Sequence, residues 1–494
     1  MEITTKSKTK KVDVGCFWVQ IKDENDQPKG IKIDHKKYIE FLRFNGFRRY
    51  DLEKEYFFIQ IINNVIEQVQ IPFIQDFVLK YVEYYENPEK TINELVLSKF
   101  YSSPGTYFHD KKFSLLMPEP NLVLNKDEKE TCYIYYRNGF VECSPNGYEL
   151  RKYNHLKKFI FKNQIINRDF IKGSHEGNFR KFCEYISEPD TEQPKGRFES
   201  LQTLIGYLCH SYYDTKMKAV CLTDSTISDS DEGRTGKTLI GKALAKIKNT
   251  CEISGKSFST ENKFRYSELE ISTQITFLND LRKDFVFELI YNDISEGLTV
   301  EKKNKQSFTH QTKMIVSANS TLKISGASGK DRIIEFELTN HYSEKYSPKD
   351  DFNEWFFSDW NENEWGLFDN FMMNCICKYL KHGIIEPVQI NLDRRKLIEH
   401  THPDFYEWME DQLSEKKIQP YSRYNKKEIY EDFLGQYPSH RNNSRSKLNN
   451  QTNFIKCLKS FIELHSDFDK ECKECKSNGL YFIELMPSNN QLKF

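Results

Sequence analysis

The clearest hydrophobic pattern in the chain is an apolar segment followed, after a polar loop, by apolar residues at helical spacing. Residues 218–223, KAVCLT, have the composition of a short buried β-strand. Beyond the loop, Leu239, Ile240, Ala243 and Leu244 recur on one face of a helix. The pattern therefore predicts a strand, a loop and a helix in direct succession.

The loop of this unit has the residues of a phosphate-binding loop. A glycine-bearing loop that ends in Lys-Thr at a helix start is typical of nucleoside triphosphatases. Backbone N–H groups at the helix N-terminus hold phosphates, the Lys237 ammonium reaches the β- and γ-phosphates, and the Thr238 hydroxyl ligates Mg²⁺. The predicted nucleotide-binding residues are Gly233, Arg234, Thr235, Gly236, Lys237 and Thr238.

One position departs from the motif. The pattern asks for glycine five residues before Gly236, where the chain has Asp231. Gly233 would then supply the flexibility, and the Asp231 carboxylate would have to point away from a triphosphate. The alternative is a chance Gly-Lys-Thr at a helix start.

Two later apolar strands end in polar residues that suit the same site. Residues 274–280 end in Asn279-Asp280, and a carboxylate here holds Mg²⁺ and polarises the attacking water. Asn279 cannot ionise, so Asp280 is the predicted ligand and catalytic acid, with Asp284 as a candidate helper. The next strand ends in Asn319, which is suited to orienting water against the γ-phosphate.

Two basic features accompany these strands. Arg332 precedes an apolar strand and is either an arginine finger for a neighbouring subunit or a local capping and pairing group. Lys302, Lys303 and Lys305 lie between the second and third strands of the unit. If these lysines lie on a hairpin at a central pore, they would contact a nucleic-acid backbone. The alternative is that they form an ordinary solvent-exposed charged surface.

The N-terminal third alternates strand and helix patterns. A hairpin is predicted over residues 17–33, and Asp34 is placed to cap the helix that follows. A second hairpin turns at Asn63-Asn64, and Pro72 at a first helical position opens another helix. This region therefore reads as α+β, and it has no Asp-x-Asp pair of the kind a metal-dependent nucleotidyl transferase needs.

The C-terminal end predicts a small separate module. Helix patterns at 426–437 and 450–465 precede a strand at 480–485, which is the outline of a winged helix. A local basic field there is either a phosphate-backbone contact or a solvated face. Its members are Arg441, Arg445, Lys447, Lys456 and Lys459. Cys472 and Cys475 have metal-like spacing, but no second pair completes a zinc site.

Composition narrows the class of protein. The 494 residues suffice for several domains, and a net charge of −1 gives no global attraction to nucleic acid. The start, MEITTKSKTKK, lacks the apolar core of a secretory signal, and no apolar run approaches the roughly 20 residues of a membrane helix. The 12 scattered cysteines fit reduced core thiols. We therefore expect a cytoplasmic protein with no membrane partner.

Taken in order, these motifs resemble a superfamily 3 helicase domain. GRTGKT, FLND, VEKKNK, KMIVSAN and KDRIIEFEL follow one another at matching intervals. The likeness begins at LIGYLCHSYYDTKMKAV and continues into NHYSEKYSPKDDFNEWFFSDW, so it covers roughly residues 200–380. This segment is most similar to the primase–helicase proteins of bacteriophages and mobile elements, especially those of Bacteroidetes. No primase motif is found in the N-terminal third.

The resemblance implies an α/β AAA+ (P-loop NTPase) core that works as a homo-hexameric ring on single-stranded or forked DNA. Its catalytic residues would be Lys237, Asp280, Asn319 and Arg332, with Thr238 and Asp280 as the Mg²⁺ ligands. Lys302, Lys303 and Lys305 would form the DNA-contacting hairpin. ATP and Mg²⁺ are the implied cofactors, a separate primase or polymerase is a further candidate partner, and the bacterial host cytoplasm is the expected location.

The predicted organisation has four parts. An α+β N-terminal region covers 1–190, the AAA+ domain 191–340, a helical extension 341–385 and a winged-helix-like module 386–494. The predicted function is an ATP-dependent, ring-forming DNA helicase in replication of a phage or mobile element. The alternatives are an AAA+ ATPase that remodels or loads proteins and a DNA-binding scaffold whose nucleotide site has decayed, because Asp231 and Asn279 replace expected residues.

Overall fold

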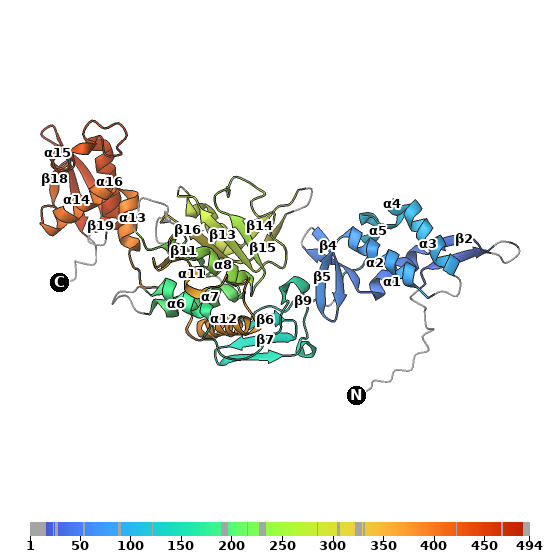
Figure 1. The fold of residues 1–494 in the computed structure, drawn as a ribbon. Coiled ribbons are helices and arrows are strands. Elements are labelled where there is room, and N and C mark those ends of the chain that lie inside the picture. The colour runs from blue at the N-terminus through green and yellow to red at the C-terminus, as the bar shows by residue number, and fades with distance from the viewer. Residues whose placement is uncertain are drawn as a thin grey trace.

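The computed structural model places three parts side by side: an N-terminal α+β part, a central part built on a parallel sheet, and a C-terminal module (Figure 1). None of the helices in the described ranges is long and apolar enough to cross a membrane. The structure describes residues 16–22, 24, 28–52, 55–86, 90–120, 122–188, 196–214, 216–226, 234–283, 285–303, 307–321, 329, 331–420, 422–465 and 468–487.

The N-terminal part has its own hydrophobic core, which draws on residues between Phe17 and Leu116. Its elements are β1 (Trp18–Lys22), β2 (Pro28–Ile33), α1 (His35–Phe44), β3 (Phe47–Leu52), β4 (Glu55–Ile62), β5 (Val65–Val69), α2 (Ile71–Tyr84), α3 (Lys90–Ser102), α4 (Pro104–Tyr107) and α5 (Asp110–Phe113). Strands β1 and β2 form a hairpin, and β3, β4 and β5 form an antiparallel sheet that β9 extends in parallel.

Local sequence signals account for several ends of these elements. The Asp34 side chain accepts hydrogen bonds from the backbone N–H groups of Lys36 and Lys37, which caps α1. Asn63 and Asn64 adopt positive φ values of 51° and 65°, as the tight turn between β4 and β5 requires. Pro72 lies in the first turn of α2. These predicted features are confirmed.

Strands β6 (Cys132–Tyr136), β7 (Gly139–Ser144) and β8 (Gly147–Arg151) form a second antiparallel sheet, which β10 (Ile165–Ile166) extends in parallel beside β6 and which packs against the central part. The same stretch of chain contains η1 (Tyr153–His155), β9 (Ile160–Phe161) of the N-terminal sheet, η2 (Lys162–Gln164) and α6 (Asn178–Ser187). Cys132, Ile134 and Tyr136 alternate along β6 and bury one face in the core of the central part. Arg168 and Asp369 add an ion pair at this contact.

This packing differs from the predicted grouping of residues 1–190. Residues from β6 through α6 share a core with the parallel sheet, whereas the N-terminal core ends near Leu116. The helices on either side of the boundary predicted between residues 190 and 191, α6 and the helix Arg197–Cys209, share this core. Residues 189–195 lie outside the described part of the chain.

The central sheet has five parallel strands in the order β12-β13-β16-β11-β17. Their elements and connections are α7 (Arg197–Cys209), β11 (Ala219–Asp224), α8 (Lys237–Ala245), β12 (Thr250–Ser254), β13 (Ile275–Leu281), η3 (Phe287–Ile290), α9 (Tyr291–Glu296), β14 (Leu298–Val300), β15 (Phe308–His310), β16 (Lys313–Ala318) and β17 (Ile333–Leu338). The five strands of the parallel sheet in this mixed α/β part therefore end at one carboxyl edge.

The predicted helical extension belongs to the same core. Helix α11 (Pro348–Phe352) leads to α12 (Glu362–His382), which lies along α7. The two helices approach so closely at Gly206 that an added Cβ would lie 2.2 Å from the Cys375 carbonyl oxygen. Glycine at this position therefore permits the close crossing, and α12 is part of the central body.

The C-terminal module combines helices with a small antiparallel sheet of order β18-β20-β19. Its elements are α13 (Leu392–His400), α14 (Pro403–Ser414), β18 (Arg423–Asn425), α15 (Lys426–Gln436), η4 (Pro438–His440), α16 (Gln451–Leu464), β19 (Phe468–Ser477) and β20 (Leu480–Pro487). From α14 onward, the elements follow one another in the order helix, strand, helix, helix and hairpin.

Candidate nucleotide site at the carboxyl edge of the parallel sheet

Helix α8 begins where the phosphate-binding loop is predicted to end. Gly236 caps the helix with φ of 111°, and a Cβ there would lie 2.7 Å from the Phe182 ring. Gly241 lies against β13, where an added Cβ would be 2.2 Å from Phe277. Both contacts need glycine, so the start of α8 is held firmly beside the carboxyl ends of β11 and β13.

The Lys237 ammonium is paired with a carboxylate at the end of β11. Its Nζ lies 2.5 Å from both carboxylate oxygens of Asp224, and the Thr235 hydroxyl donates to the same carboxylate. Lys237 and Asp224 are only 8% and 5% exposed. Each charge of the buried pair is therefore balanced by the other.

Asn279, at the end of β13, faces the predicted Mg²⁺ ligand Thr238. The Thr238 hydroxyl donates to Asn279 Oδ1 over 3.4 Å, and Ser317 on β16 donates to the same oxygen over 2.8 Å. The Asn279 side-chain amide donates to Glu252 over 2.7 Å. Neighbouring strands thus fix the orientation of the Asn279 amide, and its oxygen points at Thr238.

Asp280 is held in an unusual backbone conformation beside Asn319. Its φ is 63°, and the pairing of β13 with β16 shifts register between Leu278 and Leu281. This irregularity turns the Asp280 carboxylate away from the regular strand direction, a feature often found at functional sites. Lys256 Nζ lies 2.8 Å from the carboxylate, and the Asn319 amide donates to it over 3.4 Å.

The structure therefore brings together Lys237, Thr238, Asp280 and Asn319 around one edge of the sheet. Thr238 and Asp280 were predicted to bind Mg²⁺ together. In the structure, Thr238 hydrogen-bonds to Asn279, whereas Asp280 contacts Asn319 and Lys256. Adjacent side chains on a strand point to opposite faces, and the positive φ of Asp280 redirects its side chain further.

The remaining residues of the predicted phosphate-binding loop lie in different environments. The Arg234 side chain is exposed and lies 3.4 Å from Glu344. Thr235 is buried against Asp224. Gly233, Asp231 and Asp284 lie outside the described residues.

The predicted arginine finger and DNA-contacting lysines lie at the opposite edge of the sheet. Arg332 precedes β17, and its carbonyl accepts a hydrogen bond from Ala219 N at the start of β11. Lys302 and Lys303 follow β14 in the β14–β15 hairpin, which leads directly into the amino end of β16. Lys305 lies outside the described residues. The described residues Arg332, Lys302 and Lys303 therefore lie away from Lys237, Asp224 and Asp280.

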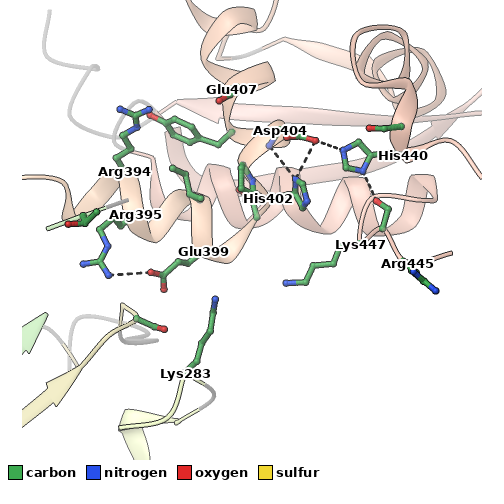
Figure 2. Close-up of a pocket in the computed structure, with 18 of the residues that line it drawn as sticks. Lys283, Arg394, Arg395, Glu399, His402, Asp404, Glu407, His440, Arg445 and Lys447 are labelled. Carbon is green, nitrogen blue, oxygen red and sulfur yellow. Dashed lines mark hydrogen bonds and ion pairs between the residues drawn. The ribbon is translucent and has the colours of Figure 1, made fainter. Parts of the chain in front are cut away.

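A pocket of about 700 Å³ lies between the carboxyl edge of the sheet and the C-terminal module, and residues of both line it (Figure 2). Asp224 and Asn319 line its sheet side, and residues of α13, α14 and the segment after η4 line the other. Arg395 of α13 donates to the backbone carbonyls of Asp224 and Asn319. The C-terminal module is therefore connected directly to the ends of β11 and β16.

The junction between the module and the sheet also uses a buried acid. The Glu337 carboxylate on β17 accepts hydrogen bonds from the backbone N–H groups of Ile390 and Asn391. Burial raises the pKa of Glu337 above its usual value, although these N–H groups favour the charged form. The contact holds the segment that leads into α13 against the edge of the sheet.

The basic residues predicted to form one surface on the C-terminal module lie in two different settings. Arg441 pairs with Glu431, and Lys459 pairs with Glu474. Arg445 and Lys447 instead line the pocket. Cys472 and Cys475 both lie on β19, opposite Leu485 and Phe482 respectively. Side chains three residues apart on a strand point to opposite faces, so these two thiols do not converge on one metal.

Several site residues were missed by the sequence analysis. Asp224 carried a usable signal, because it is a polar residue at the end of the apolar strand before the loop. Glu252, Lys256 and Ser317 had no such signal, since their roles depend on which strands are neighbours. Arg395 lies in a different part of the chain and is brought to the site only by the fold.

No family model matches the chain, and no curated protein matches it. Among solved structures, the A form apo structure of the NrS-1 C-terminal region is 12% identical with a TM-score of 0.41, over 91% of this chain and 99% of that chain. An apo structure of NrS-1 residues 305–718 is 11% identical with a TM-score of 0.39, over 91% and 98%. These values are too low to establish a shared fold, so the geometry of the site carries the functional argument.

Proposed function

We propose that this chain is an ATP-dependent, ring-forming DNA helicase that moves along single-stranded DNA during replication of a phage or mobile element. The observation that supports it most is the meeting of Lys237, Thr238, Asp280 and Asn319 at the carboxyl edge of one parallel sheet. Ligands of open α/β sheets bind at this edge, and the residue types match those needed for phosphoryl transfer.

The arrangement gives each residue a separate role. Lys237 would neutralise the β- and γ-phosphates after leaving Asp224, and the N–H groups at the start of α8 would hold the phosphate oxygens. The Thr238 hydroxyl and Asn279 Oδ1 are the oxygen donors that fit Mg²⁺, which when bound offsets phosphate charge. Asp280, oriented by Asn319, would position the attacking water and accept its proton.

The opposite edge of the sheet supplies the groups proposed to act on neighbours. Arg332 is separated from Asp224 by the six-residue strand β11, which spans about 16 Å. It would therefore complete the site of an adjacent subunit. The β14–β15 hairpin would present Lys302, Lys303 and Lys305 to DNA in the centre of the ring, and movement of this hairpin would transmit hydrolysis to the strand.

The experiment that tests the proposal is ATP hydrolysis by the full chain with and without single-stranded DNA, on material sized by light scattering. We expect a ring-sized assembly whose hydrolysis rate rises when DNA is added. Hydrolysis that is indifferent to DNA would favour an AAA+ ATPase that remodels or loads proteins. Nucleotide binding without turnover would favour a DNA-binding scaffold with a decayed site, the reading that Asn279 and Asp231 suggest.

Neutralising Lys302, Lys303 and Lys305 together to Ala is expected to weaken binding of single-stranded DNA and to flatten its salt dependence. Each lost phosphate contact lowers the slope of log K against log salt by about 0.7, so three contacts lower it by about 2. The measurement is fluorescence anisotropy over a salt series. Exposed Lys152, Lys157 and Lys158, in another loop, provide the matched triple control. An unchanged slope would move the DNA contact elsewhere.

A further inference from the structure

The pocket beside the nucleotide site contains a cluster of potential metal ligands that the proposed helicase function does not use. One nitrogen of His402, one nitrogen of His440 and a carboxylate oxygen of Asp404 all lie within 4.8 Å of one another. Figure 2 shows the Asp404 carboxylate joined to both imidazoles at the wall of the pocket. All three residues belong to the C-terminal module.

Local structure explains why these side chains converge. Pro403 opens α14, and His402 Nδ1 caps the helix by accepting from Asp404 N over 3.2 Å. His440 ends η4 and is 5% exposed, with Nε2 2.6 Å from Asp404 Oδ2. The two rings are 5.0 Å apart and perpendicular. The start of α14 therefore positions the His402 imidazole, and the end of η4 positions the His440 imidazole.

The spacing suits a small divalent ion. Nitrogen and oxygen ligands at about 2.1 Å from a tetrahedral zinc ion lie about 3.4 Å from one another. Asp404 Oδ2 lies 2.6 Å from His440 Nε2 and 4.0 Å from His402 Nδ1, so the observed separations bracket this value. Binding through His402 Nδ1 would replace the hydrogen bond that this atom accepts from Asp404 N. Small side-chain rotations would bring all three donors to one ion.

A second layer of contacts holds His440 in place. Its Nδ1 lies 2.5 Å from the Ser446 hydroxyl, which also accepts a hydrogen bond from Leu448 N. A histidine that binds a metal through one ring nitrogen commonly donates a hydrogen bond from the other, and this contact fixes the tautomer. His440 Nε2 is within hydrogen-bonding distance of Asp404 Oδ2, so a metal ion would take the place of the proton between these two atoms.

From this geometry we infer that His402, Asp404 and His440 form a binding site for a divalent transition-metal ion, with zinc as the best-fitting candidate. Two imidazoles and one carboxylate suit zinc and neighbouring transition metals, whereas magnesium prefers oxygen ligands. Three protein ligands leave a coordination position open toward the pocket. The site is distinct from the Mg²⁺ position proposed at Thr238, because its residues come only from the C-terminal module.

The ion would also stabilise the basic wall of the pocket. It would tie the start of α14 to η4, and the segment that follows η4 carries Arg445 and Lys447. Two neutral imidazoles and one carboxylate leave a net positive charge on a divalent ion. The open position would therefore favour water, hydroxide or an anionic group entering the pocket.

The test is metal binding by the full chain after chelator treatment, followed by isothermal titration with zinc chloride and visible absorption with cobalt(II). We expect stoichiometric zinc and the intense cobalt bands of a low-coordinate site. His440→Gln and Asp404→Asn should each weaken binding by about 100-fold, and Ser446→Ala by about tenfold. His465→Gln is the matched control, because His465 lies in the same module near Glu410 but outside the cluster.

Thermal unfolding of each metal-free variant shows whether the variant folds. If His440→Gln fails to fold, Asp404→Asn still tests the site, because asparagine has the same shape as aspartate. Absence of zinc and cobalt binding by the wild-type chain would overturn the inference and leave a hydrogen-bonded His–Asp–His cluster. Binding that persists unchanged in both ligand variants would also overturn it. Lys237→Ala should retain zinc binding, so failure of the metal site and failure of the helicase proposal are distinguishable.

Discussion

Replacing Lys237 by Ala is expected to reduce ATP turnover by about 10³-fold, the scale seen when one preorganised charge-stabilising donor is removed. Lys237 is buried at the start of α8, and no other cation is paired with Asp224 in the described part of the chain. The lost ammonium therefore has no local substitute. The measurement is the steady-state hydrolysis rate with saturating single-stranded DNA.

Two controls separate chemistry from folding. Lys242→Ala changes an exposed lysine on the same helix and should leave turnover within about twofold, as surface substitutions usually do. Removing Lys237 leaves the Asp224 carboxylate buried, which should lower the free energy of unfolding by about 3 kcal/mol. Adding Asp224→Asn should recover much of this stability without recovering turnover. Full activity in the Lys237→Ala chain would show that the nucleotide lies elsewhere.

Replacing Arg332 by Ala is expected to lower turnover by about 10³-fold or more, the range measured for arginine fingers. The guanidinium cannot act on its own site, because it lies at the amino edge of the sheet while Asp224, Asp280 and Asn319 lie at the carboxyl edge. Any catalytic role must therefore be exercised on a neighbouring subunit.

Mixing the two variants tests this directly. An interface between a Lys237→Ala subunit and an Arg332→Ala subunit can combine an intact phosphate site from one with an intact finger from the other, so mixed rings should regain part of the turnover. The guanidinium also lies over the Tyr291 ring at 5.6 Å. Tyr291→Leu removes that local contact and should leave turnover nearly unchanged. If mixing restores nothing, the arginine has only the local role.

Much of the secondary structure follows from local sequence. The cap at Asp34, the turn at Asn63-Asn64 and Pro72 in the first turn of α2 depend on the conformations of a few adjacent residues. The apolar runs that become β11, β13, β16 and β17 are likewise recognisable, because strands buried on both faces are almost continuously hydrophobic.

The grouping of these elements was less predictable. Strands β6 and β7 bury one face against α12, although far more residues separate them from α12 than from the N-terminal strands. A domain boundary was predicted between residues 190 and 191, yet the helices on both sides share one core. Composition reports local chain preferences, whereas a domain is defined by which apolar faces cover one another.

Local sequence was enough to predict helix α8 with its Gly-Lys-Thr start, the polar ends of the strands and the residue types that gather at the carboxyl edge of the sheet. The fold established that β16 lies between β11 and β13, which places Ser317 beside Asn279 and Asn319 beside Asp280. It also decided the pairing of Lys237 with Asp224 and the convergence of His402, Asp404 and His440. The reason is that periodicity along a chain reports which face of an element is buried, whereas contacts between side chains depend on strand order, register and packing.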